Sequence, residues 1–371
     1  VSLGESGYVI EEVGPKSTQD SDIRRLKDRC STYVDYVWAS WMATDNGGIV
    51  MDTNDLANDI DEIRSSMSQV IVGKSEAIDL LLAVFLSEGH ALIEDVPGVG
   101  KTLLAKTFAR CMGLGFRRIQ FTPDLLPADV TGVSVFNQKT LEFDFMQGPV
   151  FTDILLADEI NRATPRTQSS LLECMEERQV TVDGVTYALS ENFTVLATQN
   201  PVELSGTFPL PEAQLDRFLM KIKIGYPSKE EEEKIVLRFE KGIHGTPNVD
   251  PIGKDRIDRL KERARNVYIS NEIVGYISDI TRKSRDPKVA QLGVSPRGTL
   301  ALARACKSYA LIQGRTYVIP DDVKRLAGPV LSHRIMVSQD MFYRGKSQEE
   351  IVQEILDTVP VPCGETGEST T

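Results

Sequence analysis

The chain contains few of the residues that build metal centres or disulfide frameworks. Its three histidines lie far apart, and its five cysteines show no CxxC spacing. An odd, dispersed set of cysteines predicts reduced thiols in a cytoplasmic protein, with neither a disulfide framework nor a zinc site. These cysteines are Cys30, Cys111, Cys174, Cys306 and Cys363.

Long hydrophobic runs and an excess of positive charge are also missing. No apolar run approaches the roughly 20 residues that span a bilayer, and the polar, acidic N-terminus has no apolar core of a signal peptide. Lys and Arg number 42 against 54 Asp and Glu, a net charge of -12. This charge disfavours a general attraction to nucleic acid or anionic membrane, although local basic patches remain compatible with it.

The length and composition fit roughly two domains with hydrophobic cores, because 41% of the 371 residues are hydrophobic. Residues 1–50 form an N-terminal extension that allows two interpretations. Apolar residues recur at helical spacing from Ile23 to Trp41, which indicates an amphipathic docking helix. Alternatively, and this we favour, the stretch is not native. The leading valine is what a GTG start codon gives when translated literally, and Met51 opens a segment continuous with the nucleotide-binding part.

A glycine-rich motif lies at residues 94–102, between the apolar run 91–93 and a helical stretch from Leu103. Strand, glycine-rich turn and helix start are the context of a P-loop, although a lone match can also be plain packing. Backbone amides there would bind phosphate oxygens, Lys101 would reach the β- and γ-phosphates, and the Thr102 hydroxyl would hold Mg2+. Asp95 stands where the first glycine of the pattern usually is.

A turn formed by Val72 and Gly73 precedes a helix expected over residues 75–86. In P-loop ATPases such a turn commonly packs on the adenine. As a bare pattern it is only a turn, and it indicates nucleotide binding only because a P-loop follows it. The predicted ATP-binding residues are therefore Val72, Gly73, Pro97, Gly98, Val99, Gly100, Lys101, Thr102 and Leu103.

Two adjacent carboxylates, Asp158 and Glu159, follow the apolar run 154–157. Such a pair is common surface chemistry taken alone, but downstream of a P-loop it is the Walker B arrangement. Asp158, with Thr102, would hold Mg2+, and Glu159 would be the general base that activates the attacking water. A buried strand expected from Phe193 ends at Asn200, whose amide can orient the lytic water.

The remaining pattern predicts two hairpins and a helical C-terminal part. The hairpins pair residues 133–135 with 141–145 and 179–182 with 185–188, the second around an Asp-Gly turn. Further strands are expected at 117–121 and 219–224. From Ser228 the predicted elements are helices, over residues 229–240, 255–265, 271–282, 296–312 and 320–336.

Six motifs together resemble the MoxR family of AAA+ ATPases, over about residues 51–336. Several of them are specific to that family and not to P-loop proteins at large, and Asp95 fits the family pattern. The motifs are residues 72–73, 95–102, 121–127, 158–163, 197–201 and 211–218.

The resemblance implies an α/β fold: a P-loop AAA+ αβα core with a five-stranded parallel sheet and inserted β-hairpins, followed by an all-helical lid. The expected boundaries are 1–50 for the extension, 51–227 for the core, 228–345 for the lid and 346–371 for the C-terminal tail. It also implies ATP hydrolysis with Mg2+ in a ring, by analogy a hexamer, with each site at a subunit interface.

The resemblance also implies roles for residues outside the two Walker motifs. Asn200 resembles sensor 1, Arg217 an arginine finger given to a neighbour, Arg297 sensor 2, and Gln120 a polar switch residue facing Glu159. Two simpler interpretations stay open. Arg217 could instead pair with an acidic residue of its own loop, at 212 or 216. Arg297 follows an expected helix N-cap, where arginines usually lie on a solvated face, and nucleotide sensing would require the lid to fold back on the P-loop.

Members of this family act as chaperone-like factors that remodel, mature or activate other proteins, many with partners that carry a von Willebrand factor A domain. The sequence does not identify the client protein. The alternatives are a nucleic-acid motor, a metal-insertion ATPase resembling a magnesium chelatase subunit, and a scaffold that barely hydrolyses ATP. We expect nucleic acid to be an unlikely partner, because the chain is acidic and its hairpin tips carry little phosphate-binding charge.

Overall fold

A computed structural model describes residues 53–96, 98–200, 206–240 and 251–362. Residues 51–360 form one compact unit. Apart from positions 361 and 362, every described residue belongs to it. Both interpretations of residues 1–50, and the predicted contact of Pro97 with nucleotide, lie outside the described residues.

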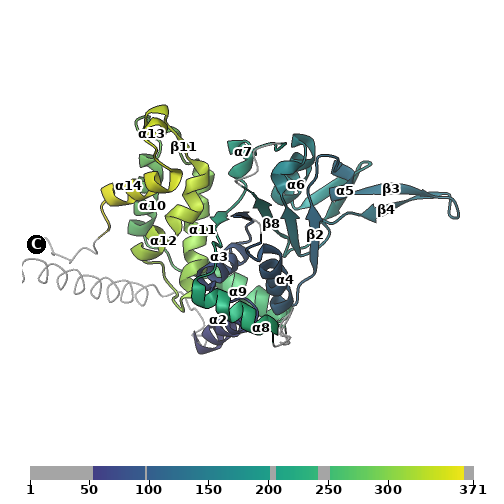
Figure 1. Ribbon diagram of the computed structural model, residues 1–371, viewed down its shortest axis with the longest axis horizontal. Coiled ribbons are helices and arrows are strands. Elements are labelled where there is room, and N and C mark those ends of the chain that lie inside the picture. Colours follow the sequence, from purple (N-terminus) through teal and green to yellow (C-terminus); the bar gives the residue numbers. More distant parts are fainter. Residues whose placement is uncertain (1–52, 97, 201–205, 241–250, 363–371) are drawn as a thin grey trace, which may run out of the picture. The chain divides into compact units, whose positions relative to one another are not determined.

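A five-stranded parallel sheet forms the centre of this unit, in the order β2-β5-β8-β1-β9 (Figure 1). Its middle strands are continuous apolar runs buried on both faces, as is typical of a parallel sheet covered by helices. The predicted α/β fold is confirmed. The strands are β1 (Ala91–Glu94), β2 (Phe116–Gln120), β5 (Ile154–Asp158), β8 (Thr194–Gln199) and β9 (Met220–Ile222).

Helices cover both faces of the sheet. Alternate strand residues such as Leu155 and Val195 pack with Leu171 and Met175 of helix α6. On the other face, α4 contacts β2 and β5, and α3 contacts β9. The helices of the two layers are α5 (Pro127–Thr131) and α6 (Pro165–Glu177) on the first face, and α2 (Thr53–Ser68), α3 (Ser75–Leu86) and α4 (Lys101–Met112) on the second.

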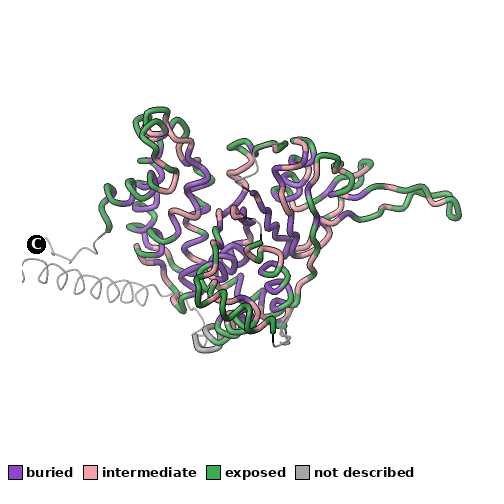
Figure 2. Tube along the Cα trace, in the orientation of Figure 1, coloured by how far each residue is buried: buried purple, intermediate pink, exposed green. Residues whose placement is uncertain are grey.

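Both predicted hairpins are present: β3 (Gly132–Asn137) with β4 (Glu142–Gln147), and β6 (Gln179–Val182) with β7 (Val185–Ala188). The first extends away from the sheet and is mostly exposed (Figure 2). Its base is held to the second hairpin, because the rings of Phe145 and Tyr187 stack with centroids 4.3 Å apart.

The C-terminal part of the unit is helical, as predicted. Helix α11 is central to it and contacts α3, α9, α10 and α12. None of the helices among the described residues has both the length and the apolar character needed to cross a bilayer. The helices are α8 (Lys229–Glu240), α9 (Lys254–Asn266), α10 (Asn271–Lys283), α11 (Pro296–Ile312), α12 (Pro320–Leu331) and the short α13 (Gln339–Tyr343).

The prediction of one helix over residues 320–336 is wrong at its C-terminal end. After Leu331 the chain forms a 3-10 turn, η2 (Ser332–Arg334), and a short strand, β11 (Met336–Val337), which pairs antiparallel with β10 (Ala290–Leu292). In the turn, the buried His333 and Arg334 contact backbone carbonyls at residues 218 and 219. The hydrophobic pattern continues past 331, but these polar contacts end the helix.

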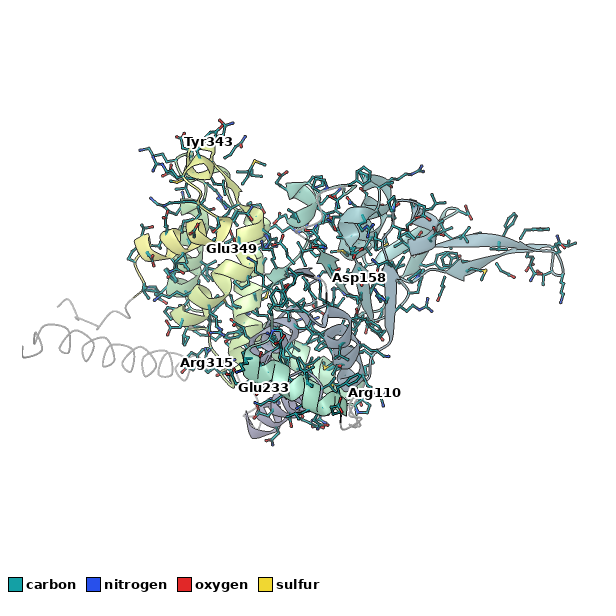
Figure 3. All side chains as sticks on the ribbon, viewed as in Figure 1. Arg110, Asp158, Glu233, Arg315, Tyr343 and Glu349 are labelled. Carbon is teal, nitrogen blue, oxygen red and sulfur yellow. The ribbon has the colours of Figure 1, made fainter. Side chains whose placement is uncertain are left out.

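The predicted start of the tail at residue 346 is also wrong, because helix α14 (Gln348–Thr358) lies there. The Ser347 hydroxyl caps this helix. The apolar face of α14, which includes Ile351 and Ile355, is buried, and α14 contacts α12. Glu349 of this helix (labelled in Figure 3) pairs with Lys221 of β9 at 3.3 Å and with Lys223, just after β9, at 2.8 Å. The amphipathic pattern of α14 therefore belongs to the folded unit.

Candidate active site

The glycine-rich loop connects the carboxyl end of β1 to the first turn of α4, which begins at Lys101. Gly98 and Gly100 have φ of 87° and 90°, a region that side chains rarely adopt. A Cβ on either glycine would meet no atom within 4 Å, so the loop faces open space there. Exposed backbone amides at a helix N-terminus form an anion site, and this space fits the phosphates of a nucleotide.

Asp95 ties this loop to the chain that follows β9. Its Oδ2 accepts hydrogen bonds from the backbone amides of Ile224 and Gly225, at 2.8 and 2.6 Å, and its Oδ1 accepts one from Val96. Its carbonyl oxygen accepts a hydrogen bond of 2.6 Å from Nζ of Lys101. The residue that departs from the usual glycine pattern thus acts as a brace for the loop.

The turn at Val72 and Gly73 lies against the start of α8. A Cβ on Gly73 would overlap the carboxyl group of Glu231, and φ there is +72°. Lys74 donates a hydrogen bond of 2.9 Å to the carbonyl of Tyr226, the residue after Gly225. The turn is therefore linked, through the segment after β9, to the brace of the glycine-rich loop.

Asp158 (labelled in Figure 3) ends β5, and Glu159 follows it. Thr198 of the neighbouring β8 holds both. The Thr198 hydroxyl donates to Oδ1 of Asp158 at 2.6 Å and accepts from the backbone amide of Glu159 at 2.8 Å. Glu159 itself has φ of 55° and precedes the 3-10 turn η1 (Ile160–Arg162). Asn200, just after β8, is buried.

Two side chains of β2 contact these carboxylates. Arg118 lies 2.6 Å from Oδ2 of Asp158 and also donates to Oε1 of Gln120 at 2.8 Å. The Gln120 amide then donates to Oε2 of Glu159 at 2.8 Å, the contact expected of a switch residue. Sequence reasoning missed Arg118 and Thr198. Alternation along β2 predicts that Arg118 and Gln120 share one face. Which carboxylates they contact follows only from the register of β2 with β5, in which Gln120 pairs with Asp158.

The residues present fit a magnesium ion. Thr102, in the first turn of α4, and Asp158 offer a hydroxyl and a carboxylate, the oxygen donors that Mg2+ prefers. Among the described residues no group of three or more His, Cys, Asp and Glu side chains is arranged to hold a metal alone. Mg2+ is commonly held by one or two protein oxygens together with water and substrate phosphates, and this donor set suits that mode.

Burial lowers the pKa of Lys101, and the charges of Asp95, Asp158 and Glu159 oppose that shift. These carboxylates lie near the lysine at the carboxyl edge of the sheet, the side at which the carboxyl ends of its parallel strands meet. Lys101 is thus placed at the loop that would bind the phosphates.

Arg217 lies at the amino edge of the sheet, the side at which the amino ends of its parallel strands meet. It follows α7 (Glu212–Leu215) and precedes β9, whose first residue is in register with the first residue of β1. The amide of Leu219 also bonds to the carbonyl of His90, just before β1. Because the strands are parallel, Arg217 is at their amino ends, whereas Lys101 and Glu159 follow carboxyl ends.

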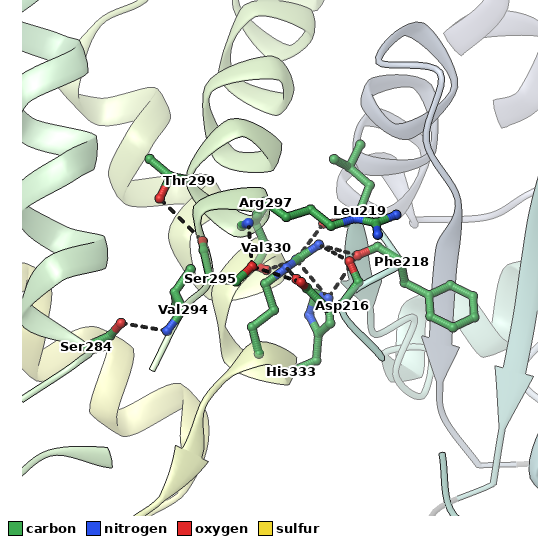
Figure 4. Close-up of polar contacts among 12 residues, drawn as sticks. Asp216, Phe218, Leu219, Ser284, Val294, Ser295, Arg297, Thr299, Val330 and His333 are labelled. Atoms are coloured by element: carbon green, nitrogen blue, oxygen red, sulfur yellow. Dashed lines mark hydrogen bonds and ion pairs between the residues drawn. The ribbon is translucent and has the colours of Figure 1, made fainter. Parts of the chain in front are cut away.

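Arg217 does not form the ion pair with residue 212 or 216 that the simpler interpretation of its role expects. It donates to the carbonyl of Leu172 at 2.6 Å and pairs with Glu176 at 3.1 Å, rather than with an acidic residue of its own loop. Asp216 instead binds Arg334 at 2.7 Å and the Ser295 hydroxyl at 2.8 Å (Figure 4).

Arg297 also lies at the amino edge. Ser295 caps α11 as expected, and Arg297 in its first turn pairs with Glu176 at 2.9 Å. Glu176 is near the end of α6, where the carbonyl of Met175 contacts the ring of His90. The structure therefore brings Arg297 next to Arg217, at the amino ends of the strands.

This fold, with a P-loop and a Walker B pair at one edge of a five-stranded sheet, defines an AAA+ ATPase. Residues 90–220 match the family model described as "ATPase family associated with various cellular activities (AAA)", and residues 282–355 match the AAA lid domain. Among AAA+ ATPases, the chain belongs to the MoxR family.

Three relatives carry that assignment. The chain is 51% identical over 297 residues to the uncharacterized protein YeaC of Bacillus subtilis, covering 80% of this chain and 92% of the relative. It is 41% identical over 324 residues to chaperone MoxR1 of Mycobacterium tuberculosis, covering 85% and 84%. It is 32% identical over 334 residues to protein MoxR of Paracoccus denitrificans, covering 81% and 96%.

A solved structure has the same fold. The crystal structure of a candidate ATPase from Cytophaga hutchinsonii has a TM-score of 0.78 and 39% sequence identity to this chain. The match covers 84% of this chain and 97% of that one.

Proposed function

We propose that this protein is an ATP-hydrolysing, chaperone-like factor that remodels, matures or activates partner proteins, and that it works as a ring with its active sites between subunits. The observation that carries the proposal is the separation of two sets of residues. Lys101, Asp158 and Glu159 lie at the carboxyl edge of the sheet, and Arg217 and Arg297 at the amino edge. Neither set alone makes a complete site for phosphoryl transfer.

The carboxyl-edge residues divide the work on ATP. The loop amides and Lys101 bind the phosphates, and Thr102 and Asp158 hold Mg2+, which when bound neutralises charge on the phosphate oxygens. Glu159 accepts the proton of the attacking water, and Asn200 orients that water. Because the Gln120 amide holds Glu159 by a hydrogen bond, Glu159 acts as a base only when that contact is released.

The amino-edge arginines serve the site of a neighbouring subunit. A guanidinium offers several donors in a fixed geometry to the charge that develops on the γ-phosphate. A ring is the closed arrangement in which every subunit both gives and receives such a residue. By the family resemblance we propose a hexamer.

The remodelling role rests on the family and on the exposed hairpin β3–β4. One relative is named a chaperone. The exposed side chains of the hairpin include Val133, Phe136, Phe143 and Met146, which suit contact with protein better than contact with a phosphate backbone. We propose a client protein and a partner with a von Willebrand factor A domain. The buried, free thiols of the described cysteines fit an ATPase of the cytoplasm.

Subunit mixing tests the shared site. Arg217→Ala and Glu159→Gln proteins are each expected to be nearly inactive alone. In mixed rings an intact Arg217 would face an intact Glu159, and part of the ATPase activity would return. If the two variants co-assemble, as shown by a tag on one of them, and activity does not return, the shared site is wrong. Normal hydrolysis by monomeric Arg217→Ala would refute the ring as well.

A further inference from the structure

One carboxylate, that of Glu176, binds two arginines from different parts of the unit. Its Oε2 lies 3.1 Å from Arg217, just before β9 in the core. Its Oε1 lies 2.9 Å from Arg297, in the first turn of α11. Each oxygen holds one guanidinium, so the separation of the two cations is set by the width of a single carboxylate.

The surroundings of Glu176 are rich in positive charge. The N-terminus of α11 carries a partial positive charge of its own, which disfavours a cation in that turn. Burial lowers the pKa of Arg334 to about 10 against the charge of Asp216, and the charges of Arg297 and Arg304 also lower it. Asp216 is occupied by Arg334 and Ser295. Among the described residues, Glu176 is the carboxylate that forms ion pairs with both Arg217 and Arg297.

The exposure of these groups indicates what Glu176 contributes. The side chains of Arg217, Arg297 and Glu176 are 29%, 43% and 37% exposed. Ion pairs this open to water add little to the free energy of unfolding. What the bridge does fix is orientation, because each long arginine side chain would otherwise sample many rotamers.

We infer that Glu176 is a positioning residue that holds Arg217 and Arg297 at a fixed spacing, so that both reach the same nucleotide of the neighbouring subunit. This inference rests on the shared site proposed above. Because Glu176 belongs to the subunit that gives the arginines, it acts on the neighbour's ATP and not on its own. The bridge also makes the orientation of a lid residue depend on that of a core residue.

The test uses the mixed rings, with Glu176→Gln added to one chain at a time. In the Glu159→Gln chain, which gives its arginines to a working site, the substitution is expected to lower the recovered kcat about tenfold, with little change in KM for ATP. In the Arg217→Ala chain, whose arginine face serves no working site, the same substitution should leave the recovered activity unchanged.

Two further variants separate spacing from charge. Glu177→Gln removes a charge that lies beside Arg217 but forms no ion pair of the bridge, and is expected to leave recovery unchanged in either chain. Glu176→Asp keeps the charge but is shorter by one methylene, so it should lose activity as well, which also keeps the test open if Glu176→Gln does not assemble.

The outcomes are distinct. Full recovery with Glu176→Gln or Glu176→Asp in the giving chain overturns the inference and leaves the shared site intact. An equal loss from both chains shows a structural effect on the ring and also overturns it. If the unmodified mixture of Arg217→Ala with Glu159→Gln recovers nothing, the shared site fails, and this inference fails with it.

Discussion

The side-chain amide of Gln120 donates a hydrogen bond of 2.8 Å to Oε2 of Glu159, and Arg162 lies 3.1 Å from the same oxygen. The base expected to activate water is thus held by two donors at the end of β5. Two donors on one oxygen fix the orientation of this carboxylate.

We expect Glu159→Gln to bind ATP and to assemble normally but to lose turnover by a factor of about 100 to 10,000, because a positioned base is removed while the phosphate site stays. Steady-state ATPase rates, with binding of a fluorescent ATP analogue and size-exclusion chromatography, measure the three properties. Near-normal hydrolysis would remove Glu159 from the mechanism.

Lys101→Ala should instead weaken nucleotide binding, by about tenfold to a hundredfold, because hydrogen bonds to charged groups contribute about 1.5–3 kcal/mol. A titration with the same fluorescent analogue gives the change in Kd. Lys106→Ala, on an exposed position of the same helix, is the matched control and should bind as the unmodified protein does. Equal affinities for all three proteins would exclude Lys101 from the site.

Asp95→Ala should weaken both the fold and the site. Three backbone amides, at residues 96, 224 and 225, lose their acceptor, and an unsatisfied group costs about 1–3 kcal/mol. We expect a lower Tm in the nucleotide-free protein and a higher Kd for ATP. Asp95→Asn keeps an acceptor oxygen and should show a smaller loss. An unchanged Tm for Asp95→Ala would refute its role as a brace.

The contact of α14 with β9 should depend on pH. Burial alone would raise the pKa of Glu349. The hydrogen bond from Lys223 and the charges of Lys221 and Lys223 outweigh burial and lower the pKa to about 2. A depressed pKa means that the carboxylate stabilises the fold fully above its unfolded value of 4.5, and that this contribution is lost as the pH falls toward about 2.

Glu349→Gln should therefore lower the free energy of unfolding at pH 7, and the difference from the unmodified protein should shrink between about pH 4.5 and 2. Denaturant unfolding at a series of pH values measures it. Glu354→Gln on the same helix, whose partner Lys346 is local, is the control. A difference that stays constant down to pH 2 would contradict the ion pairs with β9.

Much of the fold was predictable because its signals are local. A buried apolar run followed by glycines and a helix specifies the loop before Lys101, and an apolar strand ending in two acids specifies Asp158 and Glu159. The turn at Asp183 and Gly184, where both residues have positive φ, specifies the second hairpin. These patterns depend on residues near one another in the chain, so the sequence alone carries them.

Other features depend on which distant segments meet, and here the tertiary structure decided. The register of β2 with β5 brings Arg118 to Asp158, 40 residues away in the chain. Apolar packing on α12 makes α14 part of the folded unit. The parallel sheet puts Arg217 at the edge away from Lys101, and Glu176 joins it to Arg297 of the lid. The local patterns of the sequence predict which residues act on ATP. The sheet and the packing of the lid decided which of them share an edge, because long-range contacts follow from burial and strand order rather than from local pattern.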